Sequence, residues 1–197
     1  MSKLRIQKTA TNHIHIHNDI TNVARRLRKR IEEMEAAGNR EGISLDITAC
    51  LVMLAFTSES RLNFIGAKKV EKWNERDNFP TKVKAVFGGL GLQPDLTARP
   101  YSALKLLQDF RNIFAHGKPS IIEIDELMEV GPDDRYDDVD LKADWEKCVN
   151  TDFMRQCSDD IDQIWKEWLE VAGIELHETL THGSYSFDLV EELGGRE

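Results

Sequence analysis

The sequence predicts an all-α fold, an antiparallel bundle of about five helices with a short N-terminal arm and a C-terminal tail. A chain of 197 residues is long enough for one domain with its own core. Apolar residues recur at spacings of three and four, as on the buried face of a helix. Glycine, asparagine and proline lie at the ends of these stretches, where helices typically begin or end. We therefore expect an arm over residues 1–19, a bundle over 20–173 and a tail over 174–197.

The first half of the bundle is predicted to hold three helices. The first runs from about Ile20 to Ala37 and ends at Gly38. Its expected buried stripe is Val23, Leu27, Ile31 and Met34. The second runs from Leu45 to about Trp73 and is apolar nearly all round in its first half, which predicts the central, most buried element. The third spans about Pro80 to Leu90.

The second half is predicted to hold two longer amphipathic helices. The fourth helix starts near Arg99-Pro100 and ends at Gly117, with Pro119 preventing its continuation. Its expected buried stripe is Ala103, Leu106, Leu107, Phe110 and Phe114. Residues 120–140 are poorly patterned and end in an acidic loop. A long helix from about Leu141 to Ala172 follows, with tryptophans at core spacing.

Composition restricts the class of protein and its location. The longest apolar run, Ala49 to Phe56, is too short to cross a bilayer, and the N-terminus lacks the apolar stretch of a secretory signal. Three cysteines without a metal-type Cys-x-x-Cys spacing indicate reduced thiols. We therefore expect a cytoplasmic protein with no membrane partner. No cofactor is indicated.

Charge is negative overall but unevenly placed. The net charge of −9 argues against a surface that binds nucleic acid indiscriminately. Residues 1–30 nevertheless hold eight Lys/Arg against one acid, whereas residues 123–170 hold 17 Asp/Glu against five Lys/Arg. This distribution allows either a basic and an acidic face or two ordinary solvated helix surfaces.

The strongest candidate for chemistry is the stretch from Arg111 to His116, at the end of the fourth helix. Arg111 and Asn112 can bind phosphate oxygens, and His116 can move a proton. Asn112 and His116 are four residues apart and share a helix face, whereas Arg111 and His116 diverge. Two such helices meeting across a two-fold axis would bring each arginine to the other's histidine. The alternative is that Arg111 pairs with an acid and His116 only caps the helix.

This stretch, Arg111-Asn112-x-x-x-His116, resembles the signature of HEPN domains, in which an arginine and often a polar residue precede a histidine near the end of a long helix. The cluster Glu59-Ser60-Arg61-Leu62-Asn63 resembles the polar patch that some members place beside the motif. The likeness covers roughly residues 20–172 and implies a helical bundle.

The resemblance implies a metal-independent endoribonuclease, in which the RNA 2′-hydroxyl attacks the adjacent phosphorus. His116 would transfer the proton, Arg111 would stabilise the phosphorane oxygens and Asn112 would orient the phosphate. The supporting residues would be Glu59, Asn63 and Lys118. Glu59 would pair with Arg111, and Lys118 would form a positive rim together with the Arg25 to Arg30 run.

The resemblance also predicts the partners. Such sites are completed by dimerisation, so we expect a homodimer acting on RNA. Many members belong to toxin–antitoxin or phage-defence systems, which implies an antitoxin or regulatory protein that masks the site. The alternative function is a non-catalytic HEPN-like dimerisation or interaction module that binds a protein or nucleotide.

Two other patterns are weaker candidates. His13, His15 and His17 alternate as on one side of a strand, which suggests either an exposed edge strand or a metal tripod in a metal-binding regulator. The acidic run from Asp133 to Asp140 lacks the spacing of a calcium loop, which favours a solvated loop.

Overall fold

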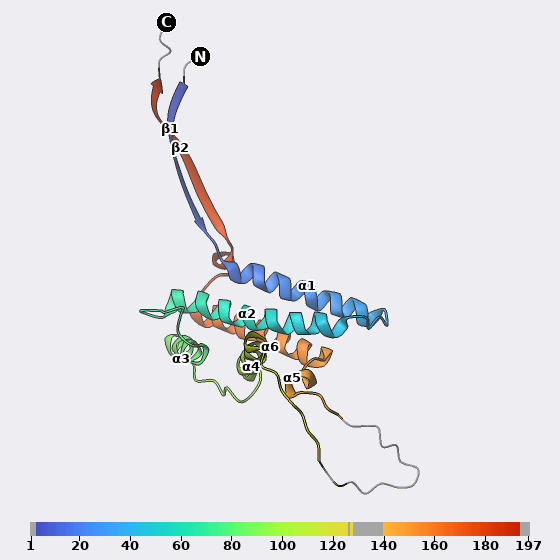
Figure 1. The fold of residues 1–197 in the computed structure, drawn as a ribbon. Coiled ribbons are helices and arrows are strands. Elements are labelled where there is room, and N and C mark those ends of the chain that lie inside the picture. The colour runs from blue at the N-terminus through green and yellow to red at the C-terminus, as the bar shows by residue number, and fades with distance from the viewer. Residues whose placement is uncertain (1–2, 126, 128–139, 194–197) are drawn as a thin grey trace.

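A computed structural model describes residues 3–125, 127 and 140–193. In this part of the chain the elements, in order, are β1 (Lys3–His13), α1 (Ile16–Ala36), α2 (Ile43–Lys69), α3 (Phe79–Leu90), α4 (Ser102–His116), α5 (Asp144–Lys147), α6 (Thr151–Ala172), the 3₁₀-helix η1 (Leu176–Thr179) and β2 (His182–Leu193). The helices form one bundle, and the two strands form a ribbon that leaves it (Figure 1).

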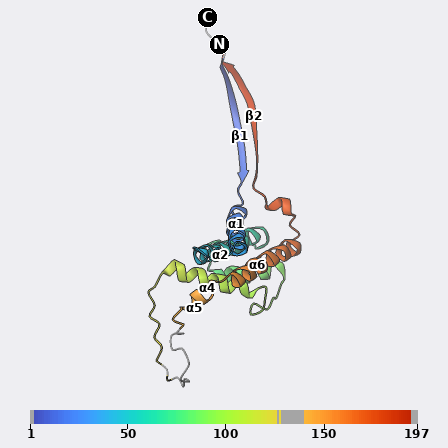
Figure 2. The same cartoon turned by 90° about the vertical axis from the view of Figure 1, so that its right-hand side faces the viewer.

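Helix α2 is the centre of the bundle, as its apolar sequence predicted. It packs against α1, α3, α4 and α6, and its burial continues into its second half through Leu62 and Ile65. Figure 2 shows α1 and α2 nearly end-on, with α4 and α6 running across them. Helix α2 is long and apolar enough to cross a membrane. The core helix of a bundle meets the same criteria of length and composition.

The prediction of an all-α fold is wrong, because the expected arm and tail form a two-stranded antiparallel sheet. β1 pairs with β2 from Lys3 opposite Leu193 to His13 opposite His182, with a bulge next to Ile6. The protein is therefore mixed α and β. The strands come from the two ends of the sequence, so no short-range turn signal reveals their pairing.

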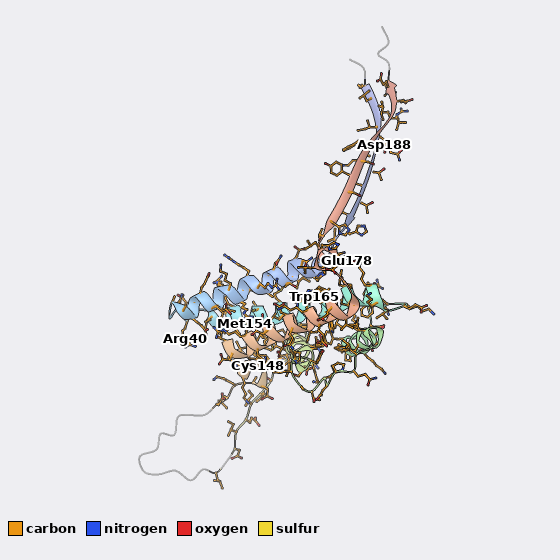
Figure 3. The ribbon with its side chains drawn as sticks, turned by 180° about the vertical axis from the view of Figure 1, so that it is seen from behind. Arg40, Cys148, Met154, Trp165, Glu178 and Asp188 are labelled. Carbon is orange, nitrogen blue, oxygen red and sulfur yellow. The ribbon has the colours of Figure 1, made fainter. Side chains whose placement is uncertain are left out.

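The ribbon projects away from the bundle, and every described residue of both strands is exposed. Seen from behind, Met154 and Trp165 lie along α6 inside the bundle, whereas Asp188 lies far out on the ribbon (Figure 3). The ribbon is attached at its base, where the backbone N–H of His15 donates to Oγ1 of Thr181 at 3.0 Å.

Several helix limits and faces differ from those predicted. The expected helix from Leu141 to Ala172 is broken, because the Asn150 side chain accepts a hydrogen bond from the backbone N–H of Phe153 at 2.8 Å and starts α6 afresh. In α1 the buried residues are His17, Thr21, Ala24 and Ile31. Val23 is exposed there, and Leu106 and Phe114 are each 40% exposed in α4. Most of the predicted acidic loop lies outside the described residues.

Candidate functional site

The end of α4 is positioned by its buried face and by Gly117. Ala103, Leu104, Leu107 and Phe110 are buried in the bundle. Gly117 takes the left-handed conformation with φ of 50°, which favours glycine, and its N–H donates to the carbonyl of Ile113 at 2.9 Å. The helix therefore ends directly after His116, as predicted, and its last two turns carry Arg111, Asn112 and His116.

Arg111 points toward α2, where it meets Glu59. Nη2 of Arg111 donates to Oε2 of Glu59 at 2.6 Å, which confirms the expected contact between these two residues. Nζ of Lys82 in α3 donates to the other carboxylate oxygen at 2.9 Å, and this lysine side chain is only 3% exposed. The guanidinium also lies 5.7 Å from the centre of the Phe56 ring. Glu59 thus joins α2, α3 and α4 in one ionic cluster.

The carboxylate of Glu59 stays ionised in this cluster. Partial burial opposes its charge, but the hydrogen bonds and positive charges of Lys82 and Arg111 outweigh burial and lower its pKa. A carboxylate held between two cations keeps both of them in fixed positions. Lys82 was missing from the sequence prediction, because a lysine in an amphipathic helix gives no sign that it is buried.

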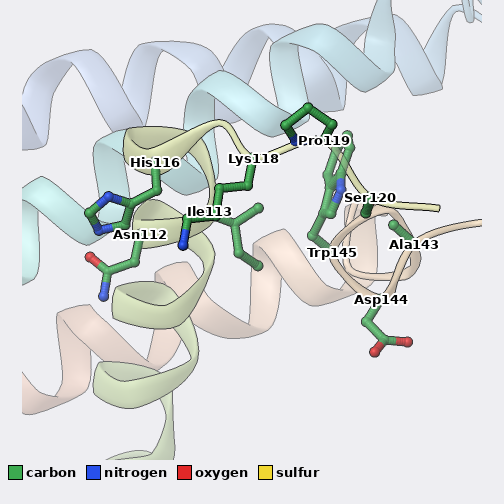
Figure 4. A pocket seen from close by; sticks show the side chains of 9 residues that line it. All are labelled: Asn112, Ile113, His116, Lys118, Pro119, Ser120, Ala143, Asp144 and Trp145. Carbon is green, nitrogen blue, oxygen red and sulfur yellow. The ribbon is translucent and has the colours of Figure 1, made fainter.

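A pocket of about 530 Å³ lies between the end of α4 and the segment around α5 (Figure 4). From α4 and the residues after it, the lining includes Asn112, Ile113, His116 and Lys118; Trp145 and Asp144 close the other side. The remaining lining residues are Pro119, Ser120 and Ala143. The pocket therefore gathers an amide, an imidazole and an ammonium group beside an aromatic wall.

Arg111 does not line this pocket. Residues five apart on a helix point about 140° apart, at 100° per residue. Arg111 accordingly lies against α2, whereas His116 is exposed on the pocket side. In a single copy of the chain, the predicted catalytic arginine and histidine do not face the same space.

The other site residues differ in their surroundings. Asn112 accepts a hydrogen bond from Nε2 of Gln108 at 3.0 Å, which orients its amide. Asn63 lies one helical turn after Glu59, and its buried Oδ1 has no hydrogen-bond partner. Trp145 packs edge-on against Phe114 with ring centres 5.2 Å apart. The sequence predicted Trp145 as core, and only the fold places it in the pocket wall.

The basic run from Arg25 to Arg30 does not form a rim at this pocket. Arg25 pairs with Asp162 at 3.2 Å and Arg28 with Asp159 at 2.6 Å, both on α6, while Arg30 pairs with Asp46 of α2 at 3.0 Å. These side chains neutralise acids of the neighbouring helices. Of the expected rim, only Lys118 lines the pocket.

Of the three histidines only His13 lies in an exposed strand, so the trio does not line one side of a strand as a metal tripod would. β1 ends at His13, which stacks on His182 with ring centres 4.7 Å apart, and α1 begins at Ile16. His17 is buried in α1 against Phe64 and Trp165, at 4.6 and 5.2 Å. Burial lowers the pKa of His17 to about 4, helped by His15 and Arg61. Among the described residues, no group of three or more His, Cys, Asp or Glu side chains is arranged to hold a metal ion.

No protein-family model, curated protein or solved structure matches the chain. The function is therefore inferred from the pocket at the end of α4 and from the contacts of Arg111, Asn112 and His116.

Proposed function

We propose that the protein is an HEPN-type endoribonuclease that cleaves RNA through attack of the 2′-hydroxyl on the adjacent phosphorus. The observation that carries this proposal is the pocket at the end of α4, which gathers Asn112, His116 and Lys118 beside Trp145. Arg111, five residues before His116, is held by Glu59 on the neighbouring side of the helix. His116 transfers the proton, a role worth roughly 10²–10⁴-fold in rate. Arg111 stabilises the charge on the phosphorane, and Asn112 orients the phosphate.

The divergence of Arg111 and His116 favours a site made by two copies of the chain. Each α4 end presents an exposed imidazole on one side and a guanidinium, 24% exposed, on the other. When two such ends meet across a two-fold axis, the arginine of each copy can approach the histidine of the other. Glu59 holds Arg111 in place before the two copies associate. Association therefore costs less side-chain conformational entropy.

The pocket suits one nucleotide in size and chemistry. Its volume lies within the usual range for small-molecule sites. Trp145 offers a ring for base stacking, which is sequence-tolerant and worth about 1–3 kcal/mol per base. Lys118 can neutralise one phosphate. Because Arg25, Arg28 and Arg30 are paired with acids of neighbouring helices, we expect local contacts rather than long-range attraction to hold the RNA.

The direct test is cleavage of end-labelled RNA by the purified full chain, with and without EDTA. We expect products with a cyclic phosphate and a 5′-hydroxyl, and no cleavage of a substrate whose sugars are 2′-deoxy. His116→Ala should lose at least about 100-fold in rate. His177→Ala, an exposed histidine in η1 away from the pocket, should cleave like the wild type. A wild type that cuts no RNA under either condition would end the proposal.

A second candidate function is a non-catalytic interaction module. It is favoured by apolar side chains left exposed beside the pocket, with Ile113 at 45% and Phe114 at 40%. Such a surface is typical of a protein-binding site. A stable complex with a protein partner that is insensitive to His116→Ala, from a chain that does not cleave RNA, would favour this function over the nuclease.

A further inference from the structure

Four histidine rings form a continuous line through the joint between the ribbon and the bundle. His13 of β1 lies directly opposite His182 of β2, and their rings stack with centres 4.7 Å apart. The ring of His15, in the short link between β1 and α1, lies 5.9 Å from that of His182 and 5.8 Å from that of His17 in α1. The line therefore runs from an exposed strand pair to a buried position in a helix.

The two inner rings have buried nitrogen atoms to which no described protein group is hydrogen-bonded. These atoms are Nδ1 of His15 and Nε2 of His17. Aromatic rings pack around them. The Phe64 ring lies 5.1 Å from that of His15, and the rings of Phe64 and Trp165 lie 4.6 and 5.2 Å from that of His17. Such surroundings favour neutral imidazole, because a proton on either atom would be buried without an acceptor.

Positive charge gathers around the inner rings. The guanidinium of Arg61, from α2, is close enough to disfavour a proton on His17. Nζ of Lys68, also from α2, lies 5.9 Å from the Phe64 ring that both inner histidines contact. Burial, followed by the charges of His15 and Arg61, lowers the pKa of His17 to about 4. His17 is therefore neutral in the closed joint, even in mild acid.

The carboxylates on the neighbouring elements are engaged elsewhere or point away. Asp162 of α6 is bound by two arginines, at 2.9 and 3.2 Å. Glu178 of η1 accepts a backbone N–H of its own turn at 2.9 Å. Asp19 is exposed on α1, and two residues along a helix turn its side chain by about 200° from that of His17. Within the described residues, a proton that enters the closed joint therefore meets no carboxylate partner.

We propose that this line of histidines is a proton-sensitive joint, which holds the ribbon to the bundle near neutral pH and opens more often in acid. Two hydrogen bonds fasten the closed joint. The backbone N–H of His15 donates to Oγ1 of Thr181 at 3.0 Å, and Nδ2 of Asn18 donates to the carbonyl of Thr179 at 2.5 Å. Because His17 lies in the first turn of α1, opening needs only that turn and its link to β1 to separate from η1 and β2, while the rest of the bundle stays packed.

Acid favours the open joint, because only the open joint leaves His17 free to take up a proton. The pKa of a histidine in water is about 6.5, whereas that of His17 in the closed joint is about 4. Between pH 7.5 and 5, this difference raises the ratio of open to closed joints about 30-fold. The outer pair adds to the effect, since His13 and His182, once protonated, place like charges directly opposite each other.

The joint lies where the ribbon meets the start of α1, whereas the pocket lies at the end of α4 (Figure 1). The inference therefore goes beyond the proposed nuclease and does not depend on it.

The test is amide hydrogen exchange of the full chain, followed by NMR at pH 7.5 and 5 and corrected for the intrinsic exchange rate. The reporters are the N–H of His15, which is bonded in the closed joint, and the N–H of Leu51, which is buried in the centre of α2. Protection of the His15 amide should fall about 30-fold between the two pH values. It should also be independent of low concentrations of urea. Protection of Leu51 should fall as urea is added, since only global unfolding exposes that amide.

Two histidine variants separate the joint from a general effect of acid. His17→Phe suits the aromatic surroundings and does not titrate, so most of the fall in protection of the His15 amide should disappear. His177→Phe, at an exposed position of η1, should respond like the wild type.

Three outcomes would each overturn the proposal. They are equal protection of His15 at both pH values in the wild type, an equal fall in His17→Phe, and a His15 amide whose exchange has the urea dependence of Leu51. The first and the third need no variant, so the experiment decides even where His17→Phe does not fold.

Discussion

Glu59 accepts a hydrogen bond from Arg111 at 2.6 Å, and this contact ties the central helix to the helix that ends in His116. The same carboxylate neutralises Lys82, whose side chain is 3% exposed. The cluster therefore contributes to the stability of the bundle and also fixes the arginine of the proposed site.

Replacing Glu59 by Gln should destabilise the protein by about 2–4 kcal/mol, because it leaves the buried ammonium of Lys82 without a counter-charge. Adding Lys82→Met should recover most of this loss, since the buried charge is then gone. Urea denaturation measures both variants. Lys105→Gln breaks an exposed pair with Asp109 and should change stability by less than about 1 kcal/mol. Equal losses in the single and the double variant would contradict the prediction.

Arg61 and Arg25 bind the same carboxylate, that of Asp162, but only Arg61 is buried. Arg61 also donates to the carbonyl of Ile161 at 2.9 Å and lies 5.1 Å from the Trp165 ring. Arg61→Ala should therefore cost about 3–5 kcal/mol. Arg25→Ala should cost less than about 1 kcal/mol, because that side chain is 58% exposed. Comparable losses in thermal unfolding would show that burial does not set the difference.

His17 should make stability depend on pH. Its pKa is about 4 in the folded protein, below the ordinary value of 6.5, so between these values only the unfolded chain binds the proton. The stability from neutral His17 is complete above pH 6.5 and is lost as pH falls toward 4. Each pKa unit is worth about 1.4 kcal/mol, so the loss is about 3 kcal/mol.

The measurement is the free energy of unfolding of wild type and His17→Phe from pH 7.5 to 4. Phenylalanine suits the aromatic surroundings of Phe64 and Trp165 and does not titrate. The variant should lose less stability than the wild type over this range. His177→Ala, an exposed control, should follow the wild type. Parallel curves for His17→Phe and the wild type would refute the prediction.

Alanine substitutions at two glycines, Gly66 and Gly88, should change the free energy of unfolding in opposite directions. A Cβ on Gly66 of α2 would lie 2.4 Å from atoms of the Trp73 ring, so Gly66→Ala should cost about 1–3 kcal/mol by overpacking. A Cβ on Gly88 of α3 meets nothing within 4 Å. Gly88→Ala should therefore stabilise the helix by up to about 1 kcal/mol. A stabilising Gly66→Ala in chemical denaturation would show that Trp73 moves away freely.

The helices could be predicted from sequence because their signals are local. The stop at Gly117 and the central place of α2 depend on residues that are neighbours in the chain. The break before Asn150 was missed because apolar spacing continues across it. The buried faces of α1 and α4 were partly wrong, since periodicity defines a stripe but the neighbouring helices decide which side of it is covered.

The sequence by itself determined the helical bundle, the end of α4 and the candidacy of Arg111, Asn112 and His116, because each depends on spacing along one segment. Only the tertiary structure decided that Glu59 and Lys82 hold Arg111, that Arg111 and the pocket lie on different sides of α4, and that the two ends of the chain form a ribbon. The physical reason is distance along the chain. Ion pairs and strand ladders join residues that lie far apart in sequence. A local pattern of apolar and polar residues does not indicate which distant segment will pack against it.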